Sequence, residues 1–116
     1  MNRMPVKHLI LLGLMVVAPS ALAAGDDRVA LGKEMAFDRA KGNCLACHRI
    51  EDGELPGTLG PPLVAMQLRF PDRSVLKQQI CDATIRQPDS RMPPFCRHGI
   101  LTEEEVDLIV DYLYTL

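Results

Sequence analysis

Residues 42–48 of the chain read Gly42-Asn43-Cys44-Leu45-Ala46-Cys47-His48 and contain the pattern C-x-x-C-H. Two thiols separated by two residues can reach the same edge of a porphyrin and add to its vinyl groups as thioethers. The histidine that follows is then placed beneath the iron. This pattern is the attachment signature of c-type haem. We therefore predict one covalent haem c, held by Cys44 and Cys47, with His48 as the proximal axial ligand.

Two other chemistries use the same residue types. A thioredoxin-type redox pair requires a βαβ context, and no strand pattern of any length occurs in the chain. A zinc site would combine Cys44 and Cys47 with two of Cys81, Cys96 and His98, but this second group lacks the spacing of zinc ribbons. Haem is the interpretation that we favour.

Composition agrees with a domain that needs help to form a core. The chain has 116 residues, of which 4% are aromatic and none is Trp, so a core built from side chains alone is small. A haem would supply the missing apolar bulk. The 13 basic and 15 acidic residues give a net charge of −2, which argues against nucleic acid as a partner.

The N-terminus is typical of a secretory signal peptide. Arg3 and Lys7 precede an apolar run over residues 9–17, and an A-x-A site follows at residues 21–23. The run is too short for a membrane span, which takes about 20 residues. We predict cleavage after Ala23, with Ala24 as the alternative. A membrane anchor or a buried helix is the other interpretation of this segment.

Cleavage would leave one domain over residues 24–116. This mature chain has 11 basic and 15 acidic residues, for a net charge of −4. No Cys follows the cleavage site directly, so we expect no lipid anchor and no stable membrane anchor. The predicted location is the periplasm, an oxidising compartment in which disulfides form.

The rest of the chain predicts an all-α fold in which Pro/Gly loops separate the helices. A first helix is expected from an Asp26 or Asp27 cap to Gly42, and one or two turns over residues 63–70. A third helix is expected to start at an Asp72 or Ser74 cap and to end before Pro88. Its apolar face consists of Leu76, Ile80 and Ala83.

The last helix has the clearest pattern. Thr102 and Glu105 form a T-x-x-E capping box, and Leu101 and Val106 are placed for a hydrophobic staple. Apolar residues then recur at helical spacing, at Val106, Ile109, Val110 and Leu113.

The sixth iron ligand is expected from a loop on the far side of the haem. Met92 begins the stretch M-P-P-F shortly before the last helix, and a thioether there would fill the open position. Met35 lies on the helix that leads into the motif, on the wrong side, and Met66 is expected to fill the core. His98 and a Cys96 thiolate remain as alternatives, since both residue types bind haem iron.

A second loop residue is expected to orient the proximal histidine. A metal-bound His usually donates its other ring N–H to a nearby acceptor. The carbonyl of Pro61, in the stretch G-P-P-L, is our candidate for His48. A plain loop turn is the alternative.

These motifs resemble those of the class I cytochromes c, over nearly all of residues 26–116. A finer resemblance is to SoxX, the small monohaem subunit of the SoxAX complex of bacterial thiosulfate oxidation. It is carried by residues 42–48, Leu55-Pro56-Gly57-Thr58-Leu59-Gly60-Pro61-Pro62-Leu63, Met92-Pro93-Pro94-Phe95 and Gly99-Ile100-Leu101-Thr102.

The resemblance to SoxX implies a partner and a role. It implies His/Met ligation, which maps onto His48 and Met92, and a class I cytochrome c fold wrapped around one haem. SoxAX couples thiosulfate to a cysteine of the SoxYZ carrier, acting as an L-cysteine S-thiosulfotransferase whose catalytic haem lies in the SoxA subunit. This chain would then be an electron-transfer subunit without catalytic residues. It would form a heterodimer with a SoxA-like cytochrome and pass electrons to a small acceptor cytochrome.

Two cysteines depart from the family pattern. The family commonly has Gly after M-P-P-F, where this chain has Cys96, and Cys81 is likewise additional. In an oxidising compartment we predict that they form a disulfide. Two buried free thiols and a disulfide to the partner subunit are the alternatives.

A different class of function also fits these motifs. A free-standing electron shuttle would carry the same haem without an enzyme partner. A haem-based gas sensor would need an open iron position, and Met92 argues against it.

Overall fold

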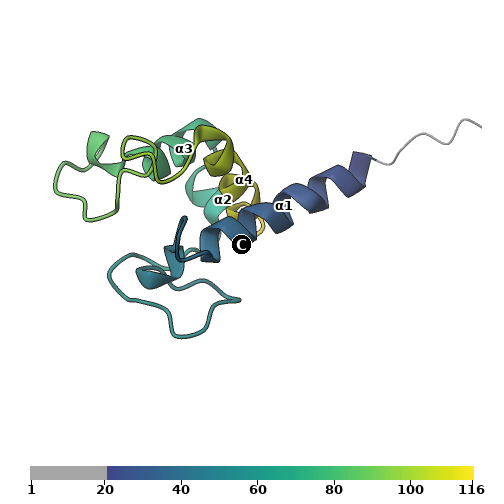
Figure 1. The fold of residues 1–116 in the computed structure, drawn as a ribbon, viewed down its shortest axis with the longest axis horizontal. Coiled ribbons are helices and arrows are strands. Elements are labelled where there is room, and N and C mark those ends of the chain that lie inside the picture. Colours follow the sequence, from purple (N-terminus) through teal and green to yellow (C-terminus); the bar gives the residue numbers. More distant parts are fainter. Residues whose placement is uncertain (1–20) are drawn as a thin grey trace, which may run out of the picture.

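The computed structural model describes residues 21–116, and all regular structure in this range is helical (Figure 1). The predicted all-α class is confirmed. The predicted signal peptide lies outside the described residues except for positions 21–23, whose backbone belongs to the first helix. No helix of the described range has the length and apolarity that crossing a bilayer requires. The helices are α1 (Ala21–Phe37), α2 (Met66–Arg69), α3 (Arg73–Cys81) and α4 (Glu103–Leu113), with 3-10 turns at Cys44–Ala46 and Ala83–Ile85.

Helices α1 and α4 cross each other and form the frame of the domain (Figure 1). A glycine permits the close approach, because a Cβ at Gly32 would lie only 1.9 Å from the carbonyl oxygen of Leu108. An ion pair between Arg28 and Asp111, with N and O 2.7 Å apart, spans the two helices. Both long loops, before α2 and before α4, lie at the same end of this pair (Figure 1).

Helix α4 begins where its capping box predicted. The Thr102 hydroxyl accepts the Glu105 N–H at 3.2 Å, and a Glu105 carboxylate oxygen accepts the Thr102 N–H at 2.9 Å. The four predicted apolar positions of the helix are buried and face the core. They are joined in one cluster by residues from the loops and the other helices, among them Ala36, Ile50, Leu63, Leu76, Ile80 and Phe95.

The first helix differs from the prediction at both ends. It already includes residues 21–25, so neither Asp26 nor Asp27 caps it. It ends at Phe37 rather than at Gly42, because Asp38 organises a tight turn. Its side chain accepts the Ala40 N–H at 2.7 Å, and its carbonyl accepts N–H groups from two later residues of the turn.

Helix α3 (Arg73–Cys81) ends before Ala83, the last residue of the apolar face that was predicted for it. Asp72 is its N-cap and accepts the Ser74 N–H at 2.9 Å. Leu76 and Ile80 are buried on it as predicted, but the helix ends at Cys81, so Ala83 is buried from a separate 3-10 turn.

Candidate haem site

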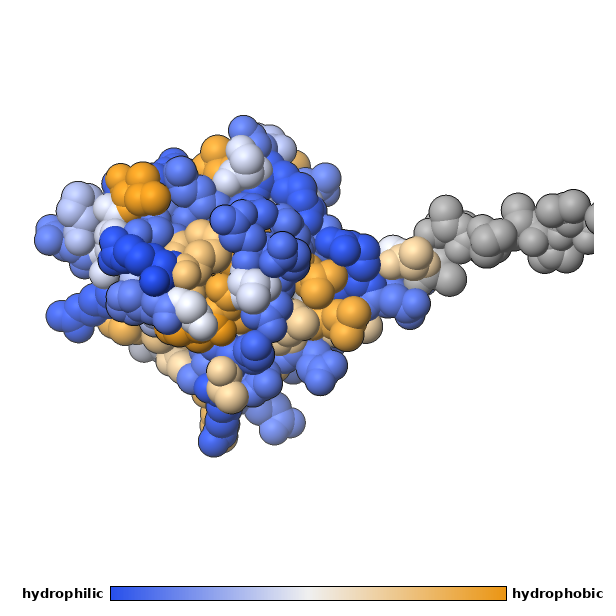
Figure 2. Space-filling model, turned by 45° about the horizontal axis from the view of Figure 1, so that its top comes forward, coloured by the Kyte–Doolittle hydropathy of each residue, from blue (hydrophilic) through white to orange (hydrophobic). Residues whose placement is uncertain are grey.

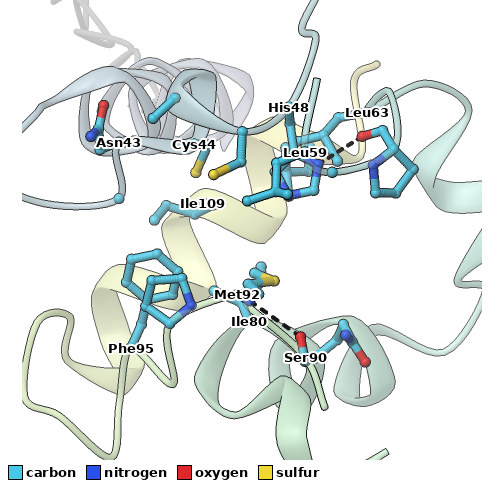
Figure 3. Close-up of a pocket in the computed structure, with 18 of the residues that line it drawn as sticks. Asn43, Cys44, His48, Leu59, Leu63, Ile80, Ser90, Met92, Phe95 and Ile109 are labelled. Atoms are coloured by element: carbon cyan, nitrogen blue, oxygen red, sulfur yellow. Dashed lines mark hydrogen bonds between the residues drawn. The ribbon is translucent and has the colours of Figure 1, made fainter. Parts of the chain in front are cut away.

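A cavity of about 780 Å³ lies between the C-x-x-C-H motif, residues 44–48, and the loop that precedes α4 (Figure 3). This volume falls within the range of about 300–1,000 Å³ that is usual for cofactor sites. Its walls are largely apolar and include seven core residues, namely Leu63, Met66, Leu76, Ile80, Phe95, Ile109 and Leu113. A flat apolar group is therefore the kind of occupant that this cavity fits.

The two motif cysteines open onto the cavity from one wall. Both Cys44 and Cys47 are unbonded and half-buried. The turn that carries them starts at Asn43, whose φ of 45° is left-handed, a conformation that Asn adopts more readily than most residues. The Cys44 carbonyl accepts the N–H groups of Cys47 at 3.2 Å and His48 at 2.9 Å. Burial is the main cause that raises the pKa of the Cys44 thiol to about 11.

The His48 ring is held by the loop that follows the motif. Its Nδ1 lies 2.7 Å from the carbonyl oxygen of Pro61, the contact expected for an orienting acceptor (Figure 3). When Nδ1 carries the proton and donates this bond, Nε2 is left with its lone pair for a metal. The backbone of Gly60 fills the space beside the ring, because a Cβ there would lie 2.3 Å from His48 Cε1.

Backbone hydrogen bonds fasten this loop to the motif. The Gly57 N–H donates to the Leu45 carbonyl and the Gly60 N–H donates to the Cys47 carbonyl, both at 2.8 Å. A Cβ at Gly57 would lie 1.9 Å from the carbonyl oxygen of Ala46. The sequence pattern did not single out Gly57 and Gly60 as site residues, and the only signal for them was their place in the stretch L-P-G-T-L-G-P-P-L.

Met92 lies on the wall opposite Cys44 and His48 (Figure 3). Its N–H donates to the Ser90 hydroxyl at 3.3 Å. Met66 also lines the cavity, but its sulfur already accepts a hydrogen bond from Arg69 Nη1 at 3.5 Å. Arg69 is a cavity residue that the sequence analysis missed.

The other ligands considered lie elsewhere. Met35 is on α1 and packs against the core, and His98 is an exposed residue beyond the cavity wall. Cys96 is bonded to Cys81 in a disulfide between the end of α3 and the loop before α4. A bonded Cys96 has no thiolate to offer to a metal.

Comparison with known proteins gives the family. Residues 29–116 match the cytochrome c family. The chain belongs to the cytochrome c family. It is also 36% identical, over 75 residues, to an uncharacterised lipoprotein of Aquifex aeolicus. That match covers 64% of this chain and 36% of the relative, so the chain corresponds to about a third of the longer protein.

Family membership implies covalent haem c, and the site fits this group. The motif places Cys44 and Cys47 on the wall of an apolar cavity. The His48 ring stands beside them with one nitrogen paired to a carbonyl. Paired thiols, an oriented imidazole and an apolar lining form the donor set and surroundings that such a group requires.

Proposed function

We propose that this cytochrome c is a monohaem electron-transfer protein with His48 and Met92 as the two axial ligands. The observation that carries the proposal is the placement of these residues on opposite walls of one cavity, with Cys44 on the same wall as His48 (Figure 3). Bound haem c supplies a one-electron ferric/ferrous couple.

The chain's residues would tune that couple. The Pro61 carbonyl fixes the His48 ring and raises its basicity as a ligand. A thioether from Met92 raises the reduction potential, and with both axial positions filled no site is left for a substrate at the metal. Electron transfer therefore fits this cavity better than catalysis does.

A more specific role is proposed from the SoxX resemblance. We infer that the chain is the SoxX-like subunit of a SoxAX complex, with a SoxA-like cytochrome as its fixed partner. The SoxYZ carrier and a small acceptor cytochrome would be transient partners. The support is the match at four separate stretches of sequence. Exposed aliphatic side chains in the segment after His48 add to it, namely Leu55, Leu59, Val64 and Leu68.

The surface gives this inference its physical basis. Figure 2 shows polar and charged residues over much of one face, with apolar residues exposed among them. Leu59 is 62% exposed and also lines the cavity, so it lies beside the site of electron exchange. Apolar residues exposed at such a place favour a stable partner. A transient shuttle is the second candidate, and it would rely on a charged rim around its redox site. Three exposed arginines that line the cavity, Arg39, Arg69 and Arg91, favour this candidate.

The location that we propose is outside the cytoplasm. The lipoprotein relative and the covalent attachment of c-type haem both suggest it, and the signal-peptide pattern over residues 1–23 agrees. The periplasm is the compartment expected for a SoxX-like subunit.

Reconstitution tests the specific role. The purified holoprotein alone should be redox-active but inert towards thiosulfate, and adding a SoxA-like subunit with the carrier protein should give thiosulfate-dependent reduction of its haem. Coupling of thiosulfate by the isolated chain, or no association with a SoxA-like subunit, would contradict the SoxX-like role. A haem stain after denaturing electrophoresis tests the cofactor separately, because covalent haem must migrate with the polypeptide.

The ligand set has its own test. The ferric protein should show the long-wavelength sulfur-to-iron absorption band of Met-ligated haem, and Met92→Ala should abolish it. Met66→Ala is the matched control. It should keep the band although it loses about 2–5 kcal/mol of stability, as truncation of a buried Met does. If Met66→Ala loses the band and Met92→Ala keeps it, the ligand is Met66 and the assignment to Met92 is wrong.

A further inference from the structure

A disulfide outside the haem-attachment motif joins α3 to the loop that carries Met92. Cys81 is the last residue of α3, and Cys96 follows Met92 by four positions. Their Cα atoms are 4.5 Å apart and the bond closes a span of 15 residues. Electron transfer itself makes no use of this bond.

The disulfide acts together with two weaker links at the base of the loop. The Cys96 N–H donates to the Cys81 carbonyl at 3.1 Å. The next residue on each side forms an ion pair, with Arg97 Nη1 2.8 Å from Asp82 Oδ2. Of these links, the disulfide is the one that a chemical change can break and remake.

Within the loop, the contacts that hold Met92 are local. The Ser90 N–H donates to the Gln87 carbonyl at 2.9 Å, and the Met92 N–H donates to the Ser90 hydroxyl. Phe95 is buried and fixes the loop on its C-terminal side. The position of Met92 therefore depends on how the two ends of the loop are held together.

We infer that the Cys81–Cys96 disulfide is a thiol-responsive control on the sixth iron position. The inference rests on the proposed ligation by Met92. A dithiol reductant gives two electrons and two protons to the bond, so that the S–S bond breaks, two thiols form and the reductant closes into its own disulfide. Both cysteines are half-buried rather than enclosed, which leaves the bond within reach of such a reagent.

Reduction of the disulfide makes release of Met92 from the iron more favourable, because the loop becomes more flexible. With the bond intact, the chain between α3 and Phe95 has few conformations that move Met92 away from the cavity. Without it, the loop gains conformations in which the thioether is withdrawn, and an external ligand then competes for the position. A disulfide oxidant such as oxidised glutathione takes up two electrons and two protons as it is reduced to thiols, and the S–S bond between Cys81 and Cys96 forms again, so the control is reversible.

Carbon monoxide binding to the ferrous holoprotein tests this control. Ascorbate reduces the iron and leaves the disulfide intact, whereas dithiothreitol reduces both, and alkylation with mass spectrometry reports the thiols. We expect carbon monoxide to bind roughly ten- to a hundredfold faster after the disulfide is reduced, because the bond restricts a loop of this length strongly. Removal of the dithiol and reoxidation should return the slow rate.

A second readout does not depend on the iron. Amide hydrogen exchange over residues 87–93 should speed up after disulfide reduction, while exchange in α4 stays slow. In the Cys81→Ser/Cys96→Ser variant, carbon monoxide binding should be fast with or without dithiol. Asp82→Asn is the matched control, since it removes the ion pair to Arg97 but keeps the disulfide, and it must still respond to the dithiol.

The outcomes separate this inference from the proposed function. With the disulfide intact, fast carbon monoxide binding to the ferrous protein, together with no sulfur-to-iron band in the ferric protein, would overturn ligation by Met92. A normal sulfur-to-iron band, together with a carbon monoxide binding rate that is unchanged after alkylation has shown both thiols free, would overturn only the role of the disulfide and not ligation by Met92. Two alkylatable thiols in the native oxidised protein would overturn it as well. If the double variant does not fold, the cycle of reduction and reoxidation in the natural protein decides the matter.

Discussion

At the scale of single residues, Gly60 decides how the His48 ring is placed. A methyl group at position 60 would sit 2.3 Å from His48 Cε1, far closer than non-bonded carbons approach. Gly60→Ala therefore has to displace the ring or the loop, and overpacking of this kind costs about 1–3 kcal/mol. We expect a lower melting temperature and a changed ferric haem spectrum, because the 2.7 Å contact of Nδ1 with Pro61 is disturbed.

A glycine in open surroundings provides the control for this prediction. Nothing lies within 4 Å of a Cβ built at Gly25, which is inside α1. Gly25→Ala should leave the haem spectrum unchanged, and it should not lower stability, since Ala favours the helix. Equal spectra and equal melting temperatures for the natural protein and Gly60→Ala would contradict the prediction. They would mean that the loop can move away from the added methyl group without loss of stability.

The same residues show what could be predicted from the sequence. Cys44, Cys47 and His48 were predicted as site residues because their residue types and spacing indicate attachment of haem c. The carbonyl of Pro61 was found because a metal-bound His needs an acceptor, and G-P-P-L was a loop near the motif. The packing of Gly60 against the ring was not predicted, because a close approach between two backbone segments leaves no pattern in either one.

At the scale of elements, the ion pair between Lys41 and Glu105 ties the turn after α1 to the start of α4. Lys41 Nζ lies 2.6 Å from Glu105 Oε1. This contact, followed by the hydrogen bond from the Thr102 N–H, lowers the pKa of the Glu105 carboxyl. A lowered pKa means that the folded state favours the charged carboxylate, so this stabilisation is present above the unfolded pKa. It is lost as the pH falls through the folded pKa.

Glu105→Gln tests this pH dependence and spares the helix cap. Gln at this position can still close the capping box, whereas the charge that pairs with Lys41 is gone. We expect the variant to be less stable than the natural protein at pH 7, by up to about 1 kcal/mol for a partly exposed pair. The difference in unfolding free energy should shrink as the pH is lowered below about 4.5, the ordinary Glu range. Denaturant titrations at several pH values measure it, and a constant difference would contradict the assignment.

Element boundaries were predicted where a side chain close in sequence decides them. Thr102 was identified as a cap, and Asp72 was one of two candidates beside Ser74, because the partner of each lies within three residues. The two predicted ends of α1 were wrong, for a different reason at each end. The helix already includes the Ala-rich residues 21–25 before Asp26. At the other end, the turn around Asp38 ends the helix before Gly42 is reached.

At the scale of the whole molecule, the core and the cavity share residues. Leu63, Ile80, Phe95 and Ile109 belong to the hydrophobic cluster and also line the cavity. Part of the apolar core therefore faces the cavity rather than another segment of the chain. A domain of this size, with so few aromatic residues, gains its stability from burying these side chains against a large apolar group.

We therefore predict that the chain without haem does not fold cooperatively. Cys44→Ser/Cys47→Ser, which cannot form the thioethers, should show weak helical circular dichroism and no sharp thermal transition. Its cavity of about 780 Å³ would lack the apolar group that the walls would otherwise contact, so the walls would be exposed to water. Cys81→Ser/Cys96→Ser is the control, because it keeps the attachment motif and should melt sharply after losing about 3 kcal/mol for a 15-residue span. A haem-free chain that melts as sharply as the holoprotein, at a similar temperature, would mean that the helices bury enough surface by themselves.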